Sequence, residues 1–82
     1  MRSGLPLPSL TGDQPLYQQL YRHISAAIQS GQVAPGERLP SKRQLCATLG
    51  VSMSTVETAY AMLVSEGYVI SRPRSGYTAA RV

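Results

Sequence analysis

Two helix-start signals lie close together near the middle of the chain, and a glycine stands between them. Ser41 and Gln44 have the spacing of a capping box, in which the serine hydroxyl and the glutamine side chain each accept from the other residue's backbone N–H. Gly50 follows after about two turns and tolerates the positive φ that ends a helix, and Ser52 can cap the next one. Residues 38–39, just before the box, can pair briefly as an edge strand. The spacing predicts two short helices that meet at a tight turn.

A longer helix precedes this turn. Asp13 can cap its start, Pro15 suits its first turn and Gly31 can end it. Its apolar residues recur at helical spacing: Leu16, Leu20, Ile24, Ala27 and Ile28, widened by Tyr17 and Tyr21. Polar residues lie away from the centre of this stripe: Gln18, Arg22, Ser25 and Gln29. We expect residues 13–82 to form one domain, and residues 1–12, rich in Pro, Gly and Ser, to be a flexible lead-in.

The helix after the tight turn is predicted over about residues 53–66, with Gly67 as its stop. Its core-facing residues are Val56, Ala59, Tyr60 and Leu63. The opposite face is small and polar and consists of Ser54, Thr58, Ala61 and Ser65. Another molecule can therefore approach this outer face closely.

A hairpin pattern follows the third helix. Residues 68–72 and 77–80 are typical of two strands, and residues 73–76 of the turn between them. Helices joined by a tight turn and followed at once by a hairpin predict a winged helix-turn-helix, a mainly α fold with a three-helix core and a small C-terminal β-wing. In that fold the last helix enters the major groove of DNA, while wing cations, here Arg72 and Arg74, can straddle the phosphate backbone.

The charge of the chain points to a polyanionic partner. Eight Lys and Arg against four Asp and Glu give a net charge of +4 and a pI near 9.7. Four of the cations fall beside the third helix, which itself carries none: Lys42, Arg43, Arg72 and Arg74. Lys42 and Arg43 lie in a first helical turn, where a cation costs roughly 0.3–1 kcal/mol because of the helix dipole. Their presence at this unfavourable position favours a functional role for them. The wing arginines also allow a plainer interpretation as ordinary solvated charges.

Residues that usually carry catalysis or bind metals are scarce. The single cysteine, Cys46, excludes an intramolecular disulfide and a tetrahedral thiolate site, and His23 is the single histidine. The carboxylates form no recognisable set of nucleophile, base and orienting group, so we expect no enzyme activity. The residues after Met1 lack the apolar core of a leader, and no apolar run approaches the roughly 18–20 residues of a membrane span. We expect a cytoplasmic chain with no membrane partner.

A family resemblance is carried by residues 39–69, LPSKRQLCATLGVSMSTVETAYAMLVSEGYV, which resemble the N-terminal DNA-binding domain of GntR-type bacterial repressors. The opening PLYQQLYRHISAAIQSGQVAPGERLPS, the Ala59-Tyr60 pair and the wing RPRSGY are similar in particular to the MocR-type subgroup. Members of that subgroup fuse this domain to an aminotransferase-like domain that binds pyridoxal phosphate. The resemblance covers nearly the whole chain after residue 13. It implies the DNA-binding module of a transcriptional regulator that binds double-stranded DNA and is a homodimer at full length, with no cofactor in these residues.

The resemblance also implies roles for single residues. Arg43 would reach a phosphate or a base edge, and Ser41 would both cap its helix and contact phosphate. Hydroxyls at the start of the recognition helix would face DNA, at an end whose N–H groups favour phosphate. In the wing, Gly76 would let the backbone approach the minor groove or the sugar edge. The expected DNA-binding residues are Ser41, Lys42, Arg43, Ser52, Met53, Ser54, Thr55, Thr58, Arg72, Arg74, Ser75 and Gly76.

The chain departs from the family pattern at Met53 and Glu57, where many members place the arginine that reads guanine. Met53 could pack on a thymine methyl group. Glu57 could accept from a cytosine amino group, or it could repel phosphate and lie off the interface. A second hypothesis for the whole domain is a protein-interaction module, in which the outer face of the third helix docks a helix or strand of a partner. That hypothesis requires the outer face to be apolar and to have few cations around it.

Overall fold

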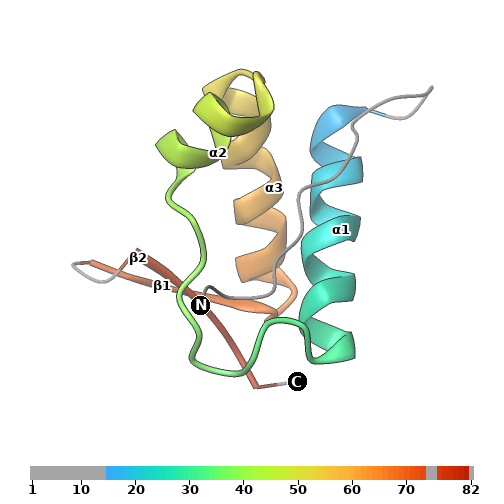
Figure 1. The fold of residues 1–82 in the computed structure, drawn as a ribbon, viewed down its shortest axis with the longest axis vertical. Helices are drawn as coiled ribbons and strands as arrows, with labels where there is room; N and C mark the ends of the chain where they lie inside the picture. The colour runs from blue at the N-terminus through green and yellow to red at the C-terminus, as the bar shows by residue number, and fades with distance from the viewer. Residues whose placement is uncertain (1–14, 74–75, 82) are drawn as a thin grey trace.

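The structure, a computed structural model, describes residues 15–73 and 76–81. It contains three helices, α1 (Leu16–Ser30), α2 (Lys42–Leu49) and α3 (Met53–Ser65), followed by two strands, β1 (Val69–Arg72) and β2 (Gly76–Ala79). Figure 1 shows α1 and α3 side by side, with α2 at one end of α3 and the hairpin at the other. This arrangement confirms the predicted winged helix-turn-helix.

The tight turn between α2 and α3 forms as its capping residues predict. The Ser41 hydroxyl accepts from the Gln44 backbone N–H at 3.1 Å, and the Gln44 side-chain oxygen accepts from the Ser41 N–H at 3.0 Å. Gly50 ends α2 with a φ of 70°, a left-handed conformation that costs other residues roughly 1–2 kcal/mol. The Ser52 hydroxyl then accepts from the Thr55 N–H at 3.3 Å. Local side-chain chemistry therefore fixes where α3 begins.

The core lies where α1, α2, α3 and the base of the hairpin meet. Its fully buried side chains include Leu20, Ile24, Val33, Leu45, Val56, Tyr60 and Leu63. Tyr60 ties three parts of the fold together, because it belongs to α3, packs its ring 4.4 Å from that of Tyr77 on β2, and donates to the Pro40 carbonyl at 2.5 Å. Burial, with a smaller contribution from Tyr77, raises the pKa of the Tyr60 hydroxyl. The core thus fixes the wing relative to α3.

The hairpin is antiparallel, and a single residue from the segment before α2 pairs with the free edge of β2. Ile70 pairs with Thr78 and Arg72 with Gly76, while Arg38 forms an isolated bridge to Thr78 on the other side of β2. Leu39 donates to the Tyr77 carbonyl at 2.8 Å, next to that bridge. The predicted edge strand at residues 38–39 is confirmed as this bridge, and Figure 1 shows the segment before α2 running past the hairpin.

Three predictions about α1 need correction. Leu16 and Tyr17 were expected on the apolar stripe, but their side chains are 39% and 38% exposed. Ser25 was expected on the polar side, but it is buried. Its hydroxyl donates to the Arg22 carbonyl one turn earlier, so burial leaves no unpaired donor. The predicted cap Asp13 and the lead-in 1–12 lie outside the described residues.

Candidate nucleic-acid interface

The N-terminal end of α3 gathers hydroxyl groups at the surface. The Ser52 hydroxyl lies 3.2 Å from that of Ser54 and 3.0 Å from that of Thr55. Ser52 and Ser54 are exposed and Thr55 is partly exposed. Each hydroxyl keeps acceptor capacity and can rotate its proton toward a new partner. The start of α3 therefore offers both hydroxyl donors and the positive end of a helix dipole to an anion.

The outer face of α3 is accessible along its length. Ser54, Thr58, Ala61 and Ser65 are all exposed, as predicted, and none has a long side chain. Val64 and Met53, on the shoulder of this face, are each 40% exposed. A helix with so little side-chain bulk on one face can bring its backbone near the floor of a groove, and the DNA major groove is wide enough to admit it.

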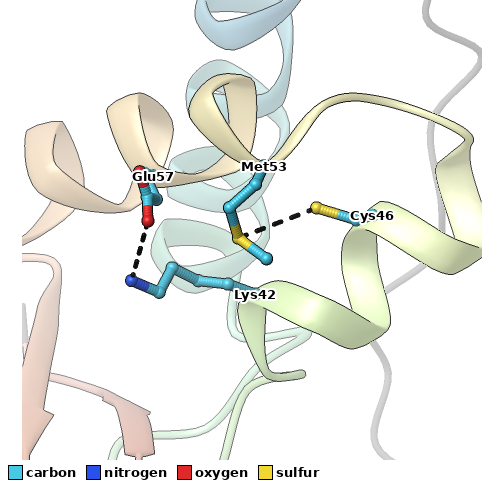
Figure 2. A network of polar contacts seen from close by, with 4 residues as sticks. All are labelled: Lys42, Cys46, Met53 and Glu57. Carbon is cyan, nitrogen blue, oxygen red and sulfur yellow. Dashed lines mark hydrogen bonds and ion pairs between the residues drawn. The ribbon is translucent and has the colours of Figure 1, made fainter.

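Lys42 and Glu57 form an ion pair between α2 and α3, which sequence reasoning did not anticipate. The Lys42 Nζ lies 3.5 Å from a Glu57 carboxylate oxygen, with the two side chains 35% and 53% exposed. Figure 2 shows both side chains pointing into the space between the two helices. Glu57 thus neutralises the cation that was expected to contact phosphate. Their separation in sequence hid the pairing, because only the tight turn at Gly50 brings the two helices together.

Met53 lies one turn before Glu57 and faces α2 in the same way (Figure 2). Its sulfur is 3.9 Å from the Cys46 sulfur. The side chain remains 40% exposed, so its methyl end is still available at the surface. Met53 and Glu57, the two departures from the family pattern, therefore stand together on the shoulder of α3 that faces the first turns of α2.

Arg43 is the unpaired cation of α2. It is exposed in the first turn, and its guanidinium makes no hydrogen bond or ion pair with any described residue. Ser41, two residues before Arg43 and the N-cap of α2, is exposed, and its hydroxyl already accepts a hydrogen bond from the Gln44 N–H. The opening of α2 thus presents one free guanidinium and one hydroxyl to an anion.

The wing places Arg72 at the end of β1, where it is exposed and opposite Gly76. Gly76 has a φ of 79°, which suits a glycine at the point where the chain turns back. The predicted contacts Arg74 and Ser75 lie outside the described residues. The described wing therefore brings Arg72 and Gly76 together at the end of the hairpin remote from the core.

Arg38 is not among the expected DNA-binding residues, and the structure gives it a specific place beside the wing. Its guanidinium lies 3.9 Å from the point where a Cβ on Gly76 would stand. The side chain is exposed and makes no ion pair with a described residue. The available sequence signal was its position next to buried Leu39 in an edge strand, because alternation then turns Arg38 outward.

The described residues do not form a site for pyridoxal phosphate. That cofactor is held through a lysine in an enclosed pocket with a phosphate cradle. Lys42 is the single lysine of the chain, and it lies at the surface paired with Glu57. No cluster of three or more metal-ligating side chains occurs in the described part of the chain. Within the same residues, no helix has the length and apolar character needed to cross a membrane.

Comparisons with known proteins agree with this geometry. The model of the family described as bacterial regulatory proteins, gntR family, matches residues 16–78. An uncharacterised HTH-type transcriptional regulator, YdeL of Bacillus subtilis, is 49% identical over 74 residues, which is 90% of this chain and 16% of that protein. The probable rhizopine catabolism regulatory protein MocR of Rhizobium meliloti is 44% identical over 64 residues, which is 78% of this chain and 13% of that protein.

A solved structure shares the fold and contains DNA. The crystal structure of the AraR DNA-binding domain in complex with operator ORR3 superposes with a TM-score of 0.78 at 33% identity, over 92% of this chain and 89% of that one. The chain spans less than a fifth of the length of the two curated relatives, 16% and 13%.

Proposed function

The chain belongs to the gntR family of bacterial regulatory proteins, and from that premise we propose how its residues meet DNA. It is a DNA-binding domain of the kind found in GntR-family transcriptional regulators. The outer face of α3 enters the major groove with its N-terminal end leading. The opening of α2 and the wing contact the backbone on either side, and the wing reaches the minor groove or the sugar edge through Gly76.

The observation that carries this proposal is the combination of a small polar face on α3 with unpaired cations on the flanking elements. Arg43 and Arg72 are exposed and have no acidic partner among the described residues. Phosphate contacts supply most of the sequence-independent affinity of such proteins, and base edges supply the specificity. The cations therefore position the domain, and Ser54, Thr55 and Thr58 lie where they can reach base edges.

Individual contacts follow from this placement. Ser52 and the first N–H groups of α3 bind one phosphate, and Ser41 with Arg43 binds another. Met53 packs on a thymine methyl group, since its exposed end lies beside the polar face. Lys42 reaches phosphate only by giving up Glu57. Arg74 and Ser75 remain part of the proposed wing contact on the strength of the resemblance.

The alternative of a protein-interaction module gains no support from α3. Its outer face is polar and small, whereas a docking face for a helix would be apolar at its centre. The exposed apolar residues Met53 and Val64 lie on the shoulder of this face, on the same side of α3 as the charged Glu57.

For the whole protein we propose a cytoplasmic regulator in which this domain is joined to a larger effector-binding domain and acts as a homodimer. The support is that its curated relatives are much longer than this chain and include MocR. Pyridoxal phosphate would bind in that larger domain. Two copies would read two half-sites about one helical turn or a multiple apart, and we propose repression as the outcome.

The test places a carboxylate in the proposed groove-facing surface. Ser54→Glu should abolish retardation of a mixed-sequence duplex at low salt, because the new charge meets phosphates and base acceptors. Ala26→Glu on the exposed side of α1 adds the same charge and should leave binding almost unchanged. Equal binding by the wild-type chain and the Ser54→Glu variant would refute the placement of α3. No retardation of the wild-type chain at any concentration would refute DNA binding by this chain.

A further inference from the structure

The hairpin has two faces with different surroundings. Paired residues in an antiparallel sheet point their side chains to the same side, and alternate residues point to opposite sides. Val69 pairs with Ala79 and Ser71 with Tyr77 on the inner face, where Val69 and Ala79 are buried. The outer face carries Arg38, Ile70, Arg72 and Thr78, which are linked across the sheet by the bridge at Thr78 and the pairs at Ile70 and Arg72.

Two surface hollows, one on each side of the hairpin, support this assignment of an inner and an outer face. Ser71 and Tyr77 line a hollow together with α3 residues such as Ala61 and Val64. A second shallow hollow lies on the other side of the hairpin and is lined by Ile70, Arg72, Thr78 and Arg81, with residues 35–36 at its border. Arg72 therefore does not point toward α3 but away from it. Arg81, just after β2, extends the same surface.

The outer face is strongly basic. Arg38, Arg72 and Arg81 are all exposed, and none of their guanidinium groups pairs with a carboxylate of the described residues. Arg38 and Arg72 come from different segments and converge on Gly76, since Arg38 lies beside it and Arg72 pairs with it. Like charges held on one face repel one another, so the arrangement favours an anion that bridges them.

We infer that the outer face of the wing, formed by Arg38, Ile70, Arg72, Thr78 and Arg81, binds successive phosphodiesters of the DNA backbone beyond the contact made by α3. This inference rests on the proposed function and extends its footprint. Guanidinium groups suit this ligand because their planar donors match phosphate oxygens two at a time. Thr78 adds a hydroxyl between them, and the exposed Ile70 side chain can lie against a deoxyribose.

The experiment measures the salt dependence of binding to a mixed-sequence duplex of about 30 base pairs, roughly three helical turns. Fluorescence anisotropy gives the slope of log affinity against log salt for the wild-type chain and for Arg38→Ala, Arg81→Ala and their double variant. Each lost phosphate contact should flatten the slope by about 0.9, and the double variant should lose about 1.8. Arg22→Ala, an exposed arginine on α1, removes the same charge and should keep the wild-type slope.

Failure of this inference is distinguishable from failure of the proposed function. If Arg43→Ala flattens the slope while the Arg38→Ala/Arg81→Ala double variant keeps the wild-type slope, DNA binding stands and the outer wing face is not part of it. If Arg22→Ala flattens the slope as much as Arg38→Ala does, only net charge matters and the inference is wrong. If the wild-type chain does not bind the duplex at all, the proposed function itself fails. Circular dichroism melts of each variant confirm that these surface changes leave the fold intact.

Discussion

Replacing Glu57 with glutamine should tighten DNA binding and steepen its salt dependence. In the free domain Glu57 holds Lys42 at 3.5 Å, with both side chains partly exposed. Exposed ion pairs of this kind contribute about 0.2–1 kcal/mol, so breaking one to turn Lys42 toward phosphate lowers affinity by a factor of roughly 1.4–5. Glu57→Gln removes that cost and also removes a negative charge that faces the phosphates. Stability should fall by no more than about 1 kcal/mol.

The assay is again anisotropy with a mixed-sequence duplex across a salt series. Affinity should rise by a factor of roughly 1.4–5, and the slope should steepen by up to about 0.9 to the extent that Lys42 stays paired with Glu57 in the wild-type complex. Glu66→Gln is the matched control, because Glu66 lies on the α1 side, where its charge adds to partial burial in raising the pKa of Tyr21. An equal gain in affinity for Glu66→Gln would show that the change in net charge alone accounts for the tighter binding. Weaker binding of Glu57→Gln would refute the reasoning and favour a direct contact of Glu57 with a cytosine amino group.

The remaining predictions concern stability. Leu45→Ala removes a buried side chain from the junction of α2 with the core and should lower the free energy of unfolding by about 2–5 kcal/mol, whereas Leu16→Ala, at an exposed position, should change it little; urea titration compares the two. Tyr60→Phe should cost about 1 kcal/mol at neutral pH, because the Pro40 carbonyl loses its donor. The raised pKa of Tyr60 means that above about pH 10 the unfolded chain releases this proton first, so wild-type stability falls with pH. The difference in the free energy of unfolding between wild type and Tyr60→Phe should therefore narrow as the pH rises above about 10, as measured in urea melts; a constant difference would contradict it.

Much of the fold could be predicted from the sequence, because short-range chemistry determines it. The capping box at Ser41, the positive φ at Gly50 and the cap at Ser52 each depend on residues within one turn. The apolar period of α3 likewise identified its buried face. Burial at single positions of α1 was harder to predict, because it depends on which neighbouring elements pack against each position: Leu16 is exposed and Ser25 is buried, against the apolar period of the helix.

The candidate site was predictable in outline but not in its charge pairing. The Lys42–Glu57 pair requires the distance between two helices, which no periodicity within either helix contains. Arg38 became part of the wing only when the edge bridge to Thr78 was known. Residues that act through contacts between elements therefore escaped sequence reasoning, whereas residues on one continuous face of α3 did not.

In the proposed complex, DNA lies against the outer face of α3 and the wing. This placement can be mapped by following the amide chemical shifts of an isotope-labelled chain during titration with a mixed-sequence duplex. We expect the largest shifts at Ser52, Ser54, Thr55 and Thr58, with further shifts at Arg43, Arg72 and Gly76, and little change along the exposed side of α1. Shifts concentrated on α1, with α3 unaffected, would contradict it.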